Sequence, residues 1–305
     1  MNTSWTEVST NCLVCGENDF RFLGVRGTRE YTGADPKAEP HIVTNVVRCR
    51  KCDFVYINPD IKGVEHWETD YYNDPDNYQA TTTGEDTKMY SKRLKLISKF
   101  KKSGQLLDIG SGKGEFINIA SQAGWSATGI EPSKYFCEFA KATYDVETIQ
   151  GHLDDDLNIP KSSIDVITLH HVLEHMNEPA AQLMIISDFL KPDGIIFIEV
   201  PNVSSIFLRV IDVYFILRGL KWSSRLSPLH PPYHKYGYDK KSLMFLLNRC
   251  NYETLIAKTY SGQERGYKSY NNKSFNFISW LRKAVSSMLN LMGNREMLCI
   301  VAKKR

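Results

Sequence analysis

Apolar runs alternate with amphipathic stretches between about residue 105 and residue 200. Several of the runs have the length and composition of buried strands, at residues 106–109, 125–130, 146–150, 163–169 and 194–200. Between them, apolar side chains recur at three- and four-residue spacing, which is the period of a helix with one buried face. Strands that alternate with helices predict right-handed crossovers and a mainly parallel sheet. The pattern therefore predicts an α/β fold.

Further elements are predicted within this core and on both sides of it. They comprise strands at 20–25, 42–48, 252–258 and 296–303, and helices at 91–100, 178–190, 239–247 and 277–292. The two early strands flank a turn-rich stretch and predict a hairpin. Asp239 is the expected N-cap of the helix that follows it. Residues 203–220 are strongly apolar, but charged residues interrupt them too often for a membrane span. A lid, a dimer face or a membrane-surface helix are the alternatives there.

The first core strand runs directly into a glycine-rich turn. Gly110, Gly112 and Gly114 stand at alternate positions shortly after Asp108. Glycines let the backbone turn sharply and let a ligand lie against it, which favours a nucleotide-type cofactor at this edge of the sheet. A dinucleotide loop requires the pattern G-x-G-x-x-G, but Glu115 occupies the place of its last glycine. The missing glycine therefore argues against an NAD oxidoreductase.

Acidic side chains around the turn favour a ligand with a positive charge. Asp108 and Glu115 would repel a pyrophosphate. Glu131 follows the second core strand, where a carboxylate can accept hydrogen bonds from both ribose hydroxyls. S-adenosylmethionine (SAM) carries a sulfonium and an α-amino group, which suits these acids. The glycine turn resembles motif I of the class I SAM-dependent methyltransferases, and Gly129 to Ser133 resembles their motif II.

This resemblance implies a Rossmann-like sheet that is mostly parallel, with an antiparallel last strand inserted between its neighbours. Family positions imply that His152 and Leu153 border the adenine, although one of residues 154–156 could bond the adenine amino group instead. A V-L-E-H run includes His175. By position, His170 borders the methionine part of SAM, and His175 faces the substrate unless it merely packs.

Two aromatic segments receive roles from the same resemblance. Tyr-rich stretches ahead of motif I often close over the cofactor, so Tyr72 or Tyr90 is expected to touch SAM, although packing between domains explains them equally well. Residues 228–238 resemble the P-P-x-H segment of zinc-knuckle methyltransferases, many of which act on sugars. Some sugar C-methyltransferases have Glu-His where this chain has Tyr233 and His234. Hydroxyl methylation therefore fits better, with His234 or His175 as the base and Tyr233 as a further candidate catalytic residue.

Four of the seven cysteines form two C-x-x-C pairs, Cys12 with Cys15 and Cys49 with Cys52. Two such knuckles supply four thiolates to one tetrahedral ion and leave no open position, so they predict a structural zinc site. The loop between the pairs is longer than the usual ~15–20 residues. Reduced cysteines packed as small hydrophobes are the alternative.

Composition narrows the class of protein without identifying the acceptor. The net charge is only +3, which is weak for a dedicated nucleic-acid binder. The first residues are polar and show no signal peptide, so a cytoplasmic protein is expected. We expect a zinc-binding β module at 1–65, a connector that covers the cofactor at 66–104, and a methyltransferase domain at 105–305. Residues 203–240 would form a lid or substrate insertion in that domain.

The predicted function is SAM-dependent methyl transfer to a hydroxyl of a sugar, a nucleotide-sugar or a surface polysaccharide. The sugar rests on family resemblance and not on residues whose chemistry points to it. One alternative is an RNA methyltransferase that uses the zinc module for recognition. Another is a non-catalytic, methyltransferase-like binding subunit.

Overall fold

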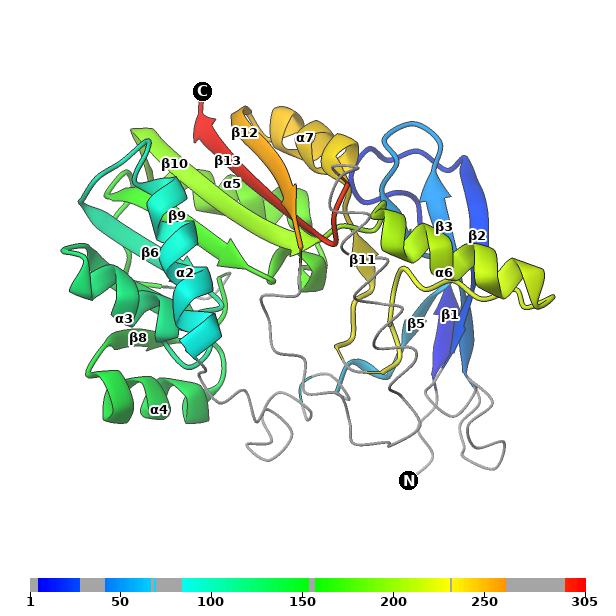
Figure 1. Cartoon of the computed structure of the whole chain (residues 1–305), viewed down its shortest axis with the longest axis horizontal. Helices are drawn as coiled ribbons and strands as arrows, with labels where there is room; N and C mark the ends of the chain where they lie inside the picture. Colours follow the sequence, from blue (N-terminus) through cyan, green and yellow to red (C-terminus); the bar gives the residue numbers. More distant parts are fainter. Residues whose placement is uncertain are drawn as a thin grey trace.

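The computed structural model describes residues 5–27, 42–66, 69, 84–153, 157–230, 232–261 and 294–305. At its centre is a seven-stranded sheet with the strand order β12-β13-β10-β9-β6-β7-β8 (Figure 1). Its strands are β6 (Gln105–Ile109), β7 (Ser126–Glu131), β8 (Glu147–Gln150), β9 (Ile164–His170), β10 (Leu190–Pro201), β12 (Tyr252–Tyr260) and β13 (Met297–Lys304). β13 is antiparallel to both β10 and β12, and the other neighbouring pairs are parallel. The predicted Rossmann-like sheet with an inserted antiparallel last strand is confirmed.

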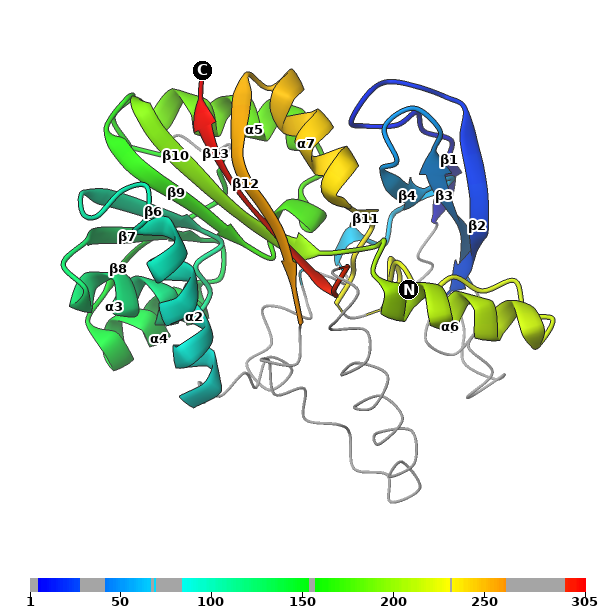
Figure 2. The same cartoon turned by 45° about the horizontal axis from the view of Figure 1, so that its top comes forward.

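Helices cover both faces of this sheet, as Figure 2 shows. α2 (Gly84–Ile97), α3 (Glu115–Gln122) and α4 (Lys134–Tyr144) lie on one face, and α5 (Pro179–Phe189) and α7 (Lys240–Arg249) lie on the other. In α3, Phe116, Ile117 and Ala120 are buried at helical spacing, so one stripe of the helix packs on the strands. The Asp239 carboxylate accepts the backbone N–H of Ser242, which confirms the predicted cap of α7.

A second sheet combines three N-terminal strands with one short strand from much later in the chain. It has the order β11-β4-β3-β2 and consists of β2 (Phe20–Gly27), β3 (Val43–Cys49), β4 (Val55–Ile57) and β11 (Tyr236–Gly237). β2 and β3 form the predicted antiparallel hairpin. β11 was not predicted, and it comes from the proline- and histidine-rich segment far along the chain. A short pair, β1 (Thr6–Val8) with β5 (Asp60–Lys62), lies beside this sheet.

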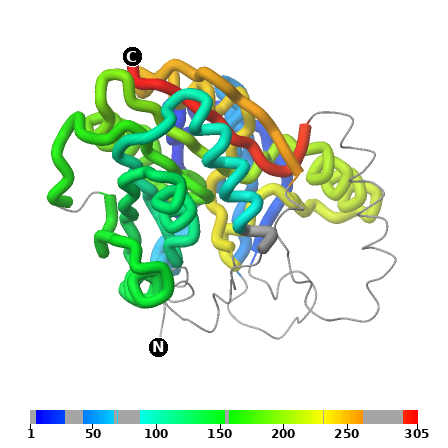
Figure 3. The backbone as a smooth tube through the Cα atoms, turned by 60° about the vertical axis from the view of Figure 1, so that its left-hand side comes forward, coloured from blue at the N-terminus to red at the C-terminus, as the bar shows by residue number. Residues whose placement is uncertain are grey.

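One hydrophobic cluster is continuous across the second sheet and the α5–α7 face. Phe54 and Tyr56 of the N-terminal part share it with Leu173, Leu243 and Leu246. Figure 3 shows α2 in front of the large sheet and the N-terminal strands behind it. The N-terminal part is therefore packed on the core. The domain limits at residues 65 and 104 stay a prediction, and much of the connector lies outside the described residues.

Some predicted element limits were wrong. The helix predicted at 91–100 begins at Gly84 and ends at Ile97. β10 begins at Leu190, and its pairing with β9 shifts between Leu190 and Ile195 because Pro192 has no N–H to donate. The helix predicted at 277–292 lies outside the described residues. Among the residues that are described, none of the helices is long and apolar enough to cross a membrane.

Candidate active site

The glycine loop joins β6 to α3 in a backbone conformation that side chains rarely adopt. Gly110, Gly112 and Gly114 have φ values of 67°, 54° and 81°. A Cβ at Gly110 would lie 2.5 Å from Val172 Cγ2, and a Cβ at Gly114 would lie 2.8 Å from Ala140. A Cβ at Gly112 would meet nothing within 4 Å. Two glycines thus permit close packing, and Gly112 borders open space where a ligand can lie against the backbone.

Glu131 ends β7 directly beside this loop. Its carboxylate accepts the backbone N–H of Gly112 over 2.9 Å and that of Ser133 over 2.9 Å. Burial raises the pKa of Glu131, while these two hydrogen bonds oppose the shift. A carboxylate has about four acceptor positions, so this one can accept further hydrogen bonds from a diol. Glu131 therefore both holds the loop and offers acceptors to a ligand.

Asp108 lies one strand away, buried near the carboxyl end of β6. The Thr168 hydroxyl donates to its Oδ1 over 2.6 Å. Burial raises the pKa of Asp108 to about 7, against the effect of the Thr168 hydrogen bond, and nearby Glu131 and Glu115 raise it further. His170 Nε2 is 4.0 Å from Asp108 Oδ1. A cationic ligand beside this carboxylate would stabilise its ionised form.

The remaining predicted cofactor residues lie at the same edge, as far as they are described. Leu153 is buried just after β8, and the neighbouring His152 is exposed but close enough to Glu131 to influence its pKa. The ring of Tyr90 on α2 is 5.7 Å from that of His170. Tyr72 and residues 154–156 lie outside the described residues.

Two of the predicted catalytic residues come together from distant parts of the chain. The rings of His175 and His234 lie 5.0 Å apart and meet edge to face. Glu174 joins them, because its Oε1 is 3.8 Å from His234 Nε2. Tyr233 precedes His234 in a tight turn, where its N–H donates to the His230 carbonyl over 2.8 Å and its φ is 58°. We call Glu174, His175 and His234 the acceptor cluster.

Buried charges continue from this cluster into the sheet. His171 Nδ1 is 3.3 Å from Glu174 Oε1, and its Nε2 is 2.9 Å from Glu199 Oε1. Arg93 on α2 donates to both carboxylate oxygens of Glu199. Burial opposes ionisation of Glu174, but the hydrogen bond and charge of His171, with charges of His234 and His175, lower its pKa to about 2.

The same balance lowers the pKa of Glu199: burial opposes ionisation, and the charge of Arg93 together with His171 outweighs it. The predicted site included neither His171 nor Glu199. A signal was present, because Glu199 is a lone acid within a buried apolar strand, a position that is rarely occupied unless the charge is paired.

The four knuckle cysteines also converge. Cys12 Sγ is 3.5 Å from Cys52 Sγ, and Cys15 Sγ is 3.4 Å from Cys49 Sγ. All four sulfur atoms lie within 4.8 Å of one another. A tetrahedral zinc ion with bonds of about 2.3 Å places its sulfur ligands roughly 3.8 Å apart. The number, type and spacing of the thiols therefore fit this ion.

The cysteine module holds the segment that carries His234. β11 pairs with β4, with Tyr236 opposite Tyr56, and Lys235 Nζ is 3.9 Å from Asp60. Arg48 of β3 binds Asp239 over 3.0 Å. These contacts follow His234 directly in the chain and hold its segment against the cysteine module.

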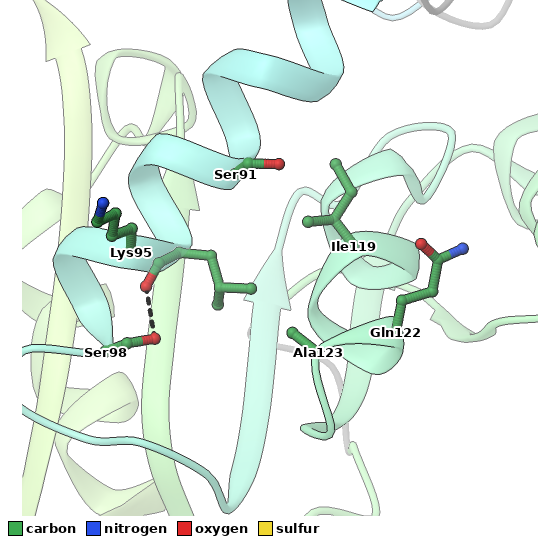
Figure 4. A pocket seen from close by; sticks show the side chains of 7 residues that line it. Ser91, Lys95, Ser98, Ile119, Gln122 and Ala123 are labelled. Atoms are coloured by element: carbon green, nitrogen blue, oxygen red, sulfur yellow. Dashed lines mark hydrogen bonds between the residues drawn. The ribbon is translucent and has the colours of Figure 1, made fainter.

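A separate hollow lies between α2 and α3, with a volume of about 470 Å³. Figure 4 shows its lining, which includes Lys95, Ile119 and Gln122, and the Ser98 hydroxyl that donates to the Leu94 carbonyl over 2.8 Å. None of the loop glycines or acceptor-cluster residues lines it. The hollow is therefore distinct from the candidate active site.

Comparisons with known proteins agree with this geometry. Residues 83–255 match the family model described as a methyltransferase domain. A ubiquinone biosynthesis O-methyltransferase of Actinobacillus pleuropneumoniae is 27% identical over 127 residues, which cover 38% of this chain and 54% of that protein. One of Saccharophagus degradans is 24% identical over 188 residues, which cover 59% of this chain and 77% of that protein. The chain thus spans about half the length of the first relative.

A solved structure supports the fold. The SAM-dependent methyltransferase of Archaeoglobus fulgidus superposes with a TM-score of 0.50 at 20% identity, covering 72% of this chain and 94% of the other. The relatives' names do not support the predicted sugar acceptor. The family match covers more than half of the chain and includes the glycine loop, Glu131 and the V-L-E-H run. The chain belongs to the methyltransferase-domain family.

Proposed function

We propose that SAM binds at the carboxyl edge of the large sheet. Glu131 would accept the ribose hydroxyls, the backbone at Gly112 would lie against the ligand, and Asp108 would face its positive charge. His152 and Leu153 would border the adenine, with His170 beside the methionine part. The observation that carries this assignment is the pairing of Glu131 with the N–H of Gly112, which links the ribose acceptor to the open part of the loop.

We infer that the acceptor atom is a hydroxyl oxygen. Bound SAM supplies a methyl group on a positively charged sulfur, which is already a good leaving group. His234 or His175 takes the hydroxyl proton as the oxygen attacks, and ionised Glu174 stabilises the resulting imidazolium. Tyr233 would help to position the acceptor. Alignment of the two reactants supplies much of the remaining rate.

The proposal concerns both the acceptor atom and the class of molecule that carries it. Oxygen methylation is supported by the names of the curated relatives, which are O-methyltransferases. Sugars, nucleotide-sugars and surface polysaccharides follow from the family resemblance of the His234 segment. A ubiquinone precursor follows from the same relatives' names, and it stands beside the sugar as the second candidate.

We also propose that Cys12, Cys15, Cys49 and Cys52 bind a structural zinc ion. Four thiolates leave no open coordination position, so the ion takes no part in methyl transfer. Its role would be to fix the sheet that holds β11, and through β11 the position of His234.

One experiment separates the acceptor classes. Purified zinc-loaded protein is incubated with methyl-tritiated SAM and a cell extract, which is then divided into nucleotide-sugars, glycans, quinone-type lipids, RNA and protein. Label in a sugar or quinone fraction, carried on an ether oxygen, is the expected result. Label in RNA, or an absence of label while S-adenosylhomocysteine still binds, would overturn the proposal.

A further inference from the structure

α6 (Ile206–Leu217) is exposed in a way that the other helices of the described chain are not. None of its residues is buried, although eleven-residue α5 and ten-residue α7 each bury four. Its exposed side chains include Val213 at 54%, Ile216 at 69% and Leu217 at 80% exposure. A helix that is apolar on most sides normally lies in a core or against lipid. In Figures 1 and 2, α6 lies at the edge of the molecule.

The inward side of α6 makes polar and aromatic contacts with the segment that follows the helix. Asp212 accepts the Ser224 hydroxyl over 2.8 Å and pairs with Arg225 over 2.8 Å. The ring of Phe215 lies 5.6 Å from that of Trp222. Asp212 is the only acidic residue of the helix, and it faces inward with its charge neutralised. The exposed side of α6 therefore carries no acid.

The exposed side and its C-terminal extension carry only positive charge. Arg209 and Arg218 are exposed, and so is Lys221 just beyond the helix. At about 100° per residue, Val213 and Leu217 lie near the centre of the exposed arc and Arg209 at its edge. Apolar residues with flanking Lys and Arg are the composition of a helix that lies in the interface of an anionic bilayer.

We propose that α6 docks on an anionic lipid bilayer, with its exposed apolar side chains at the acyl boundary and its basic residues at the lipid phosphates. A second copy of the chain fits less well. A symmetric dimer would bring the same basic residues of both copies together without an exposed acid on the helix to neutralise them. The proposal goes beyond methyl transfer and does not depend on the acceptor.

Vesicle co-sedimentation of the full zinc-loaded chain tests this proposal. Vesicles contain either phosphatidylcholine alone or phosphatidylcholine with phosphatidylglycerol. We expect binding to the anionic vesicles, at least tenfold weaker binding to the neutral ones, and loss of binding at high salt. Removing both charges in Arg218→Gln with Lys221→Gln should weaken binding about 25-fold, at roughly fivefold per charge.

The apolar contribution is tested separately. Ile216→Ser with Leu217→Ser should weaken vesicle binding at least tenfold, whereas Met184→Ser, which changes a 57% exposed apolar residue on α5, should leave it unchanged. Unchanged binding of S-adenosylhomocysteine shows that each variant is folded. Three results overturn the proposal: no vesicle binding, equal binding of the double serine variant, or a dimer in light scattering that this variant dissociates.

Discussion

The glycine loop and the acceptor cluster lie at the same carboxyl edge of the large sheet, but they are built differently. Glu131 and Gly112 are joined by a hydrogen bond between neighbouring β–α units. His234, which lies 3.8 Å from Glu174, stands just before β11, and β11 pairs with β4 in the module that also holds the four cysteines. The cofactor side therefore depends on nearby sequence, and the acceptor side depends on a distant module.

The largest expected effect comes from loss of the proposed zinc site, which supports the acceptor side and not the cofactor side. Cys12→Ser should lose one equivalent of zinc and lower the melting temperature by about 10 °C or more, because structural zinc contributes folding free energy directly. Differential scanning calorimetry and metal analysis measure both changes. Cys137→Ser on α4, outside the cysteine cluster, is the control and should keep its zinc. Zinc loss without a change in melting temperature would contradict the supporting role of the module.

The acceptor cluster is tested by turnover. His234→Gln or His175→Gln should lower kcat about 10²- to 10⁴-fold, whichever residue is the base, because a positioned base contributes about that much. His230→Gln lies in the same segment and serves as the matched control. Steady-state rates are measured with the acceptor fraction found by labelling. If both variants turn over at the wild-type rate, neither histidine is the base.

A smaller effect concerns Asp108 and pH. Its pKa is raised to about 7 in the free protein, and a cationic ligand favours the ionised form. Binding therefore releases a proton below pH 7, and SAM affinity should fall about tenfold from pH 8 to pH 6. Asp108→Asn is the control that should abolish the dependence. A pH-independent Kd for the wild type would show that Asp108 does not face the charge.

Local sequence signals predicted which residues meet around the glycine loop. Glycine spacing and the acid after the second strand are short-range features, and the structure brings Gly112 and Glu131 into contact. The strand order with β13 between β10 and β12 also matched the resemblance. These features could be predicted because each depends on residues close in sequence or on a repeated β–α pattern.

Long-range contacts were harder to predict. β11 has only two residues, and its partner β4 lies far away along the chain, so no periodic pattern marks the pair. His171 was missed because its role comes from two glutamates on different segments, Glu174 and Glu199. His175 and His234 were each proposed as the base for chemical reasons, but nothing in the sequence predicted that their rings would lie together.

The most direct test of the two-part account is calorimetric titration of S-adenosylhomocysteine into the wild type and three variants. Glu131→Gln should weaken binding about 100-fold, because two hydrogen bonds to a charged acceptor are lost. Glu147→Gln, at an exposed position on neighbouring β8, and His234→Gln should change the affinity less than about threefold. Equal affinity of Glu131→Gln and the wild type, or an equally large loss in His234→Gln, would contradict the account.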